Sequence, residues 1–150
     1  MSITDIKTVA IAGAGTMGAL IAQTFASHGY TVVLWNRSEV GLARGRSIMA
    51  ENLDTVPPAE RDAVPSIITM TTDPACFRDA DFVLESISED LEVKKAFYRQ
   101  LEPLLKETCL VSTNTSGLSI TALAEALPEH TVVPYPNLPK SKYPSSRKGQ

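Results

Sequence analysis

The sequence has few of the features that mark secreted, membrane or metal-binding proteins. Among its 150 residues there is no apolar run near the roughly 18 to 20 residues that cross a bilayer. The N-terminus lacks the basic stretch followed by an apolar block that is typical of a secretory signal. The two cysteines, Cys76 and Cys109, lie 33 residues apart, which indicates neither a zinc cluster nor a disulfide framework. We therefore expect a cytoplasmic protein with reduced thiols, no membrane partner and no bound metal.

Acidic residues are absent from the last 17 residues, which carry four Lys or Arg and four prolines. The first 133 residues carry 10 Lys or Arg and all 17 acids, so the two parts have net charges of −7 and +4. A tail so poor in apolar groups cannot bury enough surface to offset its ordering entropy. We expect one domain over residues 1–133 and a disordered tail over residues 134–150. The net charge of −3 does not point to nucleic acid as a partner.

What is present is an average globular composition, with 43 % apolar and 21 % charged residues. Short β-branched or apolar runs alternate with stretches of helical spacing, in which we expect Met17, Ile21 and Phe25 on one buried face and Val93 and Phe97 on another. The expected strands are residues 8–12, 31–35, 67–70, 82–86, 110–113 and 131–133. This alternation predicts an α/β protein with a doubly wound parallel sheet in the order 3-2-1-4-5-6, the Rossmann arrangement.

Polar loops follow four of these strands, at residues 13–18, 36–38, 86–90 and 114–117. The carboxyl ends of parallel strands lie at one edge of a sheet, where ligands of doubly wound proteins bind. We therefore expect all four loops to line one ligand site.

The first of these loops fits the pattern G-x-G-x-x-G between a strand and a helix. Such a loop turns tightly at its first glycine, lets the backbone approach a pyrophosphate at its second, and packs helix on strand at its third. The helix N-terminus then presents free N–H groups to the anion. We predict that the loop binds a dinucleotide through Gly13, Gly15, Thr16, Met17 and Gly18.

The second loop bears on the choice between NAD and NADP. An acid after the second strand binds the ribose hydroxyl of NAD, whereas a nearby arginine accommodates the 2′-phosphate of NADP. This chain has Asn36, Arg37 and Ser38 there, which we expect to bind cofactor and to favour acceptance of NADP at least as well as NAD. The alternatives are that Glu39 serves the ribose, or that Arg37 stacks on adenine or lies in solvent.

Two further segments, residues 81–95 (DFVLESISEDLEVKK) and 112–120 (STNTSGLSI), closely resemble the 3-hydroxyacyl-CoA dehydrogenases. The resemblance extends over about residues 7–130 and implies the NAD-binding domain of an oxidoreductase that moves a hydride between nicotinamide and a 3-hydroxyacyl-CoA. It implies that Glu89 and Lys94 line the nicotinamide side, with Lys94 also near the acyl-CoA substrate. It also implies that Asn114 and Ser116 are catalytic, Ser116 contacting both cofactor and substrate oxygen.

The chain departs from this family after the sixth strand. The family continues into a segment with a general acid/base histidine and then a helical domain, neither of which is found here. His130 precedes the strand end and is expected at the surface, and His28 ends the first helix. We therefore expect a truncated chain that is weakly active or inactive alone, and a possible homo-oligomer. The alternatives are an NADP-dependent reductase similar to β-hydroxyacid dehydrogenases, and a non-catalytic dinucleotide-binding module.

Overall fold

The computed structural model describes residues 6–53, 68–87, 90–114, 123, 125–128, 130 and 132–134. The predicted tail lies outside these residues except for Pro134, which ends the last strand. Within the described part no helix is long and apolar enough to cross a membrane.

Six parallel strands form one sheet in the predicted order β3-β2-β1-β4-β5-β6. The first, second and fifth strands have the predicted bounds, the third and the sixth are each shifted by one residue toward the C-terminus, and the fourth ends at Glu85. The strands are β1 Thr8–Ala12, β2 Thr31–Trp35, β3 Ile68–Thr71, β4 Phe82–Glu85, β5 Leu110–Thr113 and β6 Val132–Pro134. The order reverses between β1 and β4, whose pairing aligns Ala12 with Glu85. This is the point at which a doubly wound sheet opens to a ligand.

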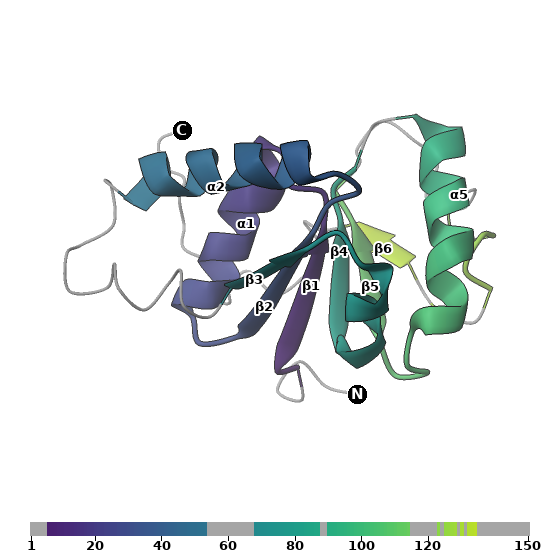
Figure 1. Ribbon diagram of the computed structural model, residues 1–150. Helices are drawn as coiled ribbons and strands as arrows, with labels where there is room; N and C mark the ends of the chain where they lie inside the picture. The colour runs from purple at the N-terminus through teal and green to yellow at the C-terminus, as the bar shows by residue number, and fades with distance from the viewer. Residues whose placement is uncertain are drawn as a thin grey trace.

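Helices cover both faces of the sheet, with α1 (Thr16–Ser27) and α2 (Glu39–Leu53) on one side and α5 (Leu91–Leu101) on the other (Figure 1). Gly29, at φ +91°, follows the C-cap of α1 and ends that helix as predicted. Two short 3₁₀ helices, η2 (Pro74–Asp79) and η3 (Glu102–Leu104), complete the described helices. The periodicity did not indicate η2, which begins where the Asp73 carboxylate accepts the N–H of Ala75 at 2.9 Å.

The core consists of two apolar layers, one on each face of the sheet. One layer joins alternate strand residues such as Val9, Ile11 and Leu84 to Ile21 and Phe25 of α1. The other joins the remaining strand positions to α5, η2 and the chain near Leu123: Ala10, Ala12, Val83 and Val111 with Phe77, Phe97, Tyr98, Leu101, Leu123 and Leu127. Because both faces are covered, β1 from Val9 to Ala12 and β4 from Phe82 to Leu84 are continuous apolar runs rather than alternating with polar residues.

Two residues expected on buried helix faces are exposed instead. Met17 is 52 % exposed and Val93 is 42 % exposed. Each lies in the first turn of its helix, where its neighbour Gly18 or Lys94 is buried instead. Ile21 and Phe97, one turn later, are buried as expected.

Candidate functional site

The four predicted loops do begin side by side at one edge of the sheet. The first residue after each of these strands continues the backbone ladder to the end of a neighbouring strand. These bonds run from Gly13 N to Trp35 O at 2.8 Å, Asn36 N to Thr71 O at 3.2 Å, Ser86 N to Ala12 O at 2.8 Å and Asn114 N to Glu85 O at 2.8 Å. The first residues of the four loops are thus aligned along a common edge.

Two glycines of the first loop are required by its packing. Gly13 has φ +111°, and a Cβ there would lie 2.4 Å from the carbonyl oxygen of Ser86. A Cβ on Gly18 would lie 1.9 Å from the carbonyl oxygen of Gly13. Both contacts are with backbone, which cannot turn aside as a side chain can. The loop therefore lies tightly between β4 and α1.

Gly15 differs from these two, because a Cβ there would meet nothing within 4 Å. It is the N-cap of α1 and provides no side-chain hydrogen bond, and the first turn of α1 contains no acid. The neighbouring helices are capped: Ser38 Oγ accepts the N–H of Gly41 at 3.1 Å in α2, and Asp90 accepts the N–H of Val93 at 3.1 Å in α5. The free N–H groups and positive dipole end of α1 are thus left for an anion.

The side chain of Asn36 joins the glycine loop to α2. Its Oδ1 accepts the N–H of Ala14 at 3.1 Å, and its Nδ2 donates to the carbonyl oxygen of Ser38 at 3.3 Å. A Cβ on Gly41 would lie 1.9 Å from that Nδ2, so α2 passes close over the amide. Asn36 and Ser38, expected to face the ribose, use their polar atoms within the protein, whereas Arg37 is exposed. Their contact with a cofactor stays a prediction.

On the other half of the edge, Lys94 is buried rather than open to solvent, with 1 % of its side chain exposed. Its ammonium forms an ion pair with Glu85 and donates to the carbonyl oxygen of Ile87 at 3.2 Å. Burial and the negative charge of Glu85 raise the pKa of Tyr98, which donates to the same carboxylate. Glu85 was not identified from the sequence, although an acid ending the apolar run Phe-Val-Leu is itself an unusual signal.

The remaining predicted site residues are only partly described. Asn114 donates from Nδ2 to the Ser86 hydroxyl at 3.3 Å, which ties the loop after β5 to the loop after β4. Glu89 and Ser116 lie outside the described residues. Thr16 is exposed at the start of α1, beside Met17.

One histidine differs from its prediction. His130 was expected at the surface, but its side chain is 3 % exposed. Its Nε2 donates to the carbonyl oxygen of Lys106 at 2.8 Å, and its Nδ1 lies 3.5 Å from Oε2 of Glu102. The turn after Leu127 folds the ring inward, which the local polar sequence does not indicate. His28 is the C-cap of α1, as expected.

Both cysteines are free thiols on the α5 side of the sheet. Burial raises the pKa of Cys76 and that of Cys109 to about 12 each. Because the thiolate is the reactive form, neither is poised as a nucleophile at neutral pH. Within the described residues no group of three His, Cys, Asp or Glu could hold a metal ion.

Comparison with known proteins decides the family. Residues 8–134 match the family model described as 3-hydroxyacyl-CoA dehydrogenase, NAD binding domain. The chain belongs to this family. The cofactor of the family domain is therefore NAD.

Curated members of the 3-hydroxyacyl-CoA dehydrogenase family are similar to most of this chain. The 3-hydroxyadipyl-CoA dehydrogenase of Escherichia coli is 40 % identical over 128 residues, covering 80 % of this chain and 26 % of the relative. The 3-hydroxybutyryl-CoA dehydrogenase of Clostridioides difficile is 34 % identical, covering 79 % of this chain and 44 % of the relative. The chain thus spans between about a quarter and somewhat under half the length of these relatives.

Solved structures agree on the fold. The crystal structure of (S)-3-hydroxybutyryl-CoA dehydrogenase from Ralstonia eutropha superposes with a TM-score of 0.79 at 29 % identity. That match covers 85 % of this chain and 48 % of the other. The similarity confirms the doubly wound fold that the strand order predicts.

Proposed function

We propose that this chain holds the dinucleotide for hydride transfer between nicotinamide and a 3-hydroxyacyl-CoA. The observation that carries the proposal is the uncapped N-terminus of α1 behind Gly15, where a Cβ would meet nothing within 4 Å. Backbone N–H groups and the helix dipole favour a pyrophosphate at such a position. Gly13 and Gly18 keep the loop in place, and Thr16 and Met17 flank it.

The adenosine half belongs over β1 and β2 and the nicotinamide half over β4 and β5, because the order reverses between β1 and β4. In this proposal Glu89 and Lys94 border the nicotinamide side. Asn114 and Ser116 supply donors at the carboxyl end of β5, where a hydrogen bond would stabilise charge developing on the substrate oxygen. NAD supplies the hydride acceptor when bound.

For cofactor choice, we propose that NADP is accepted at least as well as NAD. Asn36 places an uncharged amide where an acid would repel a 2′-phosphate, and the exposed Arg37 can pair with it. The hydrogen bond from Ala14 to Asn36 also fixes the distance between this loop and the glycine loop. NAD remains the cofactor by which the family is named.

A second candidate is a dinucleotide-binding module without turnover. It is favoured by one observation, that the polar side chains of Asn36 and Lys94 at this edge form hydrogen bonds within the protein. The cytoplasmic location and the homo-oligomer expected from the sequence stay predictions under both candidates.

The proposal is tested by titrating the 150-residue chain with NADH and NADPH and following nicotinamide fluorescence. Saturable one-to-one binding of either nucleotide, competed by ADP, supports it. Absence of binding to a chain that shows cooperative thermal unfolding would contradict both candidates.

A further inference from the structure

We propose that Glu85 is a positioning residue that fixes Lys94 and the backbone at Ile87 beneath the nicotinamide half of the edge. This inference rests on the proposed cofactor site. It assigns a role to a buried carboxylate that the reaction itself does not use.

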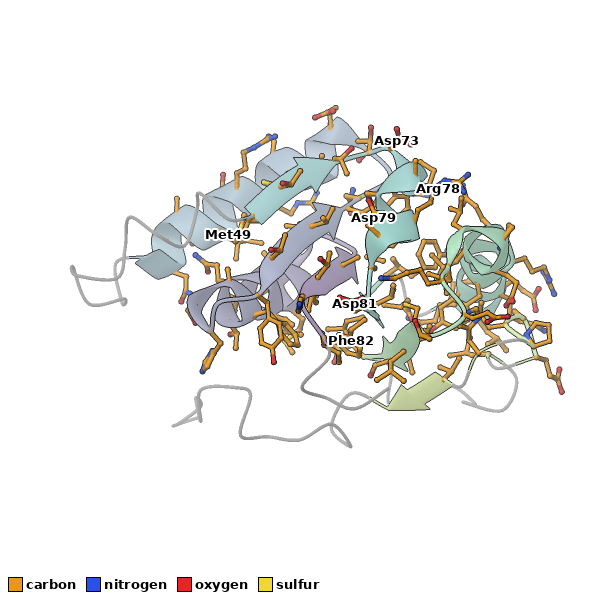
Figure 2. The ribbon with its side chains drawn as sticks, turned by 90° about the horizontal axis from the view of Figure 1, so that it is seen from below. Met49, Asp73, Arg78, Asp79, Asp81 and Phe82 are labelled. Atoms are coloured by element: carbon orange, nitrogen blue, oxygen red, sulfur yellow. The ribbon has the colours of Figure 1, made fainter. Side chains whose placement is uncertain are left out.

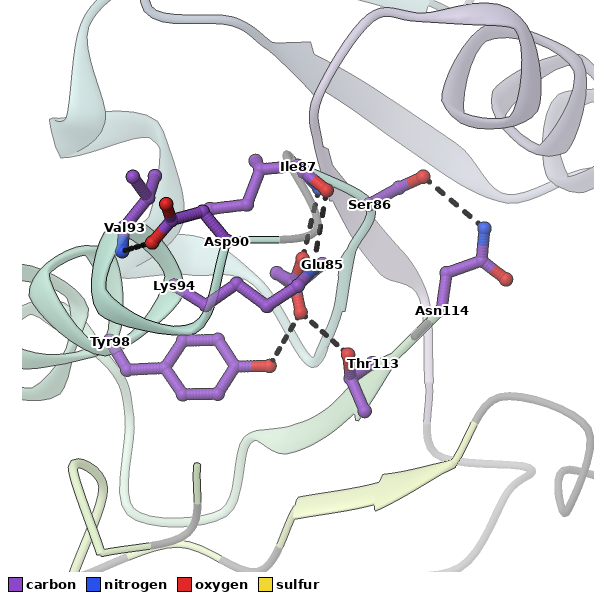
Figure 3. Close-up of polar contacts among 9 residues, drawn as sticks. All are labelled: Glu85, Ser86, Ile87, Asp90, Val93, Lys94, Tyr98, Thr113 and Asn114. Atoms are coloured by element: carbon purple, nitrogen blue, oxygen red, sulfur yellow. Dashed lines mark hydrogen bonds and ion pairs between the residues drawn. The ribbon is translucent and has the colours of Figure 1, made fainter. Parts of the chain in front are cut away.

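Glu85 lies at the carboxyl end of β4 and is fully buried, with 0 % of its side chain exposed. It accepts four hydrogen bonds, two on each oxygen (Figure 3). Oε1 accepts from the Tyr98 hydroxyl at 2.8 Å and from the Thr113 hydroxyl at 2.6 Å. Oε2 accepts from the N–H of Ile87 at 2.9 Å and from the Lys94 ammonium. One carboxylate therefore ties together β4, β5, α5 and the loop that follows β4.

The peptide groups of Ile87 are held on both sides. Its N–H donates to Glu85, and its carbonyl oxygen accepts from Lys94 at 3.2 Å. The residue before it, Ser86, has its carbonyl oxygen directly against Gly13, where a Cβ would lie 2.4 Å away. The loop is thus clamped where it passes the glycine loop, at the point where the strand order reverses.

Stability alone does not account for this arrangement. A buried ion pair can often be replaced by apolar side chains with little loss of stability, because desolvation offsets much of the attraction. An apolar pair, however, could not hold the Ile87 N–H and carbonyl oxygen at fixed positions. The carboxylate therefore serves to fix the positions of the Ile87 peptide groups at the carboxyl edge of the sheet.

Lys94 also retains one N–H donor beyond its two described contacts. Of its three N–H donors, the described contacts engage two, with Glu85 and Ile87. The third is oriented by the other two, so Glu85 determines where Lys94 can donate to a bound nicotinamide riboside.

The test measures the Kd values of NADH and ADP-ribose for the variant Glu85→Gln and for the unaltered chain. This variant keeps the shape of the side chain, and the Tyr98 and Thr113 hydroxyls can accept from the new amide, while the anion that pairs with Lys94 is lost. We expect the Kd for NADH to rise at least fivefold and the Kd for ADP-ribose, which lacks nicotinamide, to change by less than twofold.

Two further variants keep the proposal falsifiable. Thr113→Val removes one donor to Oε1 and changes no residue that we propose to contact the cofactor. Even if Glu85→Gln does not fold, this variant should raise the Kd for NADH, by less than about fivefold, and leave the Kd for ADP-ribose within about twofold. Phe25→Leu, on the opposite face of the sheet, is the control for a general loss of stability and should move neither Kd.

Equal changes in the Kd values of NADH and ADP-ribose, or no change in either for a folded Glu85→Gln, would overturn the positioning role of Glu85. The proposed cofactor site would stand in either case. Failure of the unaltered chain to bind NADH would instead overturn the proposed function and this inference with it.

Discussion

At the scale of single residues, the glycine loop combines two kinds of requirement. Gly13 and Gly18 are demanded by contacts inside the protein, since a methyl group on either would overlap a backbone oxygen. Gly15 faces open space and has φ −72°, which any residue adopts without strain. Its position at the N-terminus of α1 is where we propose that the pyrophosphate binds.

Gly15→Val and Gly18→Ala should therefore separate binding from folding. Gly15→Val should keep the melting temperature and weaken NADH binding at least tenfold, about 1.4 kcal/mol. Gly18→Ala should lower the free energy of unfolding by about 2 kcal/mol or more, because the added Cβ overlaps the Gly13 carbonyl. Calorimetric melting and NADH titration on both variants are the measurements. Unchanged NADH affinity in a folded Gly15→Val protein would exclude the pyrophosphate from this loop.

Cofactor choice is a second matter for single residues. Arg37→Ala should raise the Kd for NADPH by about tenfold and the Kd for NADH by less than about threefold. The reason is that a charge-assisted contact with the 2′-phosphate of NADPH is lost. Arg46→Ala removes the same charge from the exposed side of α2 and serves as the control. Equal losses for NADPH and NADH in Arg37→Ala would indicate stacking or general electrostatics instead.

At the scale of elements, the sequence predicts the alternation of strands and helices well, because strands covered on both faces are short apolar runs ended by glycine or polar loops. The sequence predicts which loops lie together at the carboxyl edge of the sheet, but not which side chains there bond to one another. Periodicity places Met17 and Val93 on buried helix faces, although both lie in the first turn of a helix and are exposed. Spacing along the chain likewise does not reveal that Glu85 and Lys94, nine residues apart, meet in the core.

A partly buried carboxylate joins the opposite ends of the strands. Asp81, which precedes β4 and is labelled in Figure 2, accepts the N–H groups of Lys7 and Thr8 at 2.9 and 3.0 Å and the Lys106 ammonium at 2.6 Å. Burial alone would raise the pKa of Asp81, but the bond from Lys106 and those from the backbone outweigh it and lower the pKa to about 2. The folded state therefore favours the ionised form.

The stability that Asp81 contributes should depend on pH. Its folded pKa is below its ordinary value of 3.8, so the contribution is full above about pH 4 and is lost as the pH falls toward 2. Asp81→Asn should lower the melting temperature at pH 7, and the difference from the unaltered chain should shrink between pH 4 and 2. Asp79→Asn, on the neighbouring η2, removes the same charge as a control. A difference that stays constant with pH would rule out the ionised carboxylate as the cause.

At the scale of the whole molecule, the chain carries a complete doubly wound sheet and a fraction of its relatives' length. Hydride transfer to or from a 3-hydroxyacyl-CoA also requires a proton partner for the oxygen and a closed substrate site. General acid/base groups typically contribute 10² to 10⁴-fold to such reactions. The relatives are longer than this chain, which spans 26 % of one and 44 % of the other.

The 150-residue chain alone should therefore bind dinucleotide yet turn over acetoacetyl-CoA at least about a hundredfold more slowly than a full-length relative. Steady-state oxidation of NADH and NADPH, with the relative assayed in parallel, measures this. A rate near that of the relative, abolished by Ser116→Ala, would show that another residue of this chain acts as the acid. Tyr135, which follows the last strand, would be the first to substitute.

The two free thiols lie on the α5 side of the sheet, where the rate of thiol alkylation can measure local opening of the structure. Cys109 is buried and burial raises its pKa to about 12, so its alkylation requires the surrounding structure to open, whereas Cys76 in η2 is only half-buried. The rate of Cys109 modification in a mildly destabilised sample therefore measures local opening just before β5. Comparing that rate with and without nucleotide shows whether ligand binding at the edge also stabilises the sheet near β5.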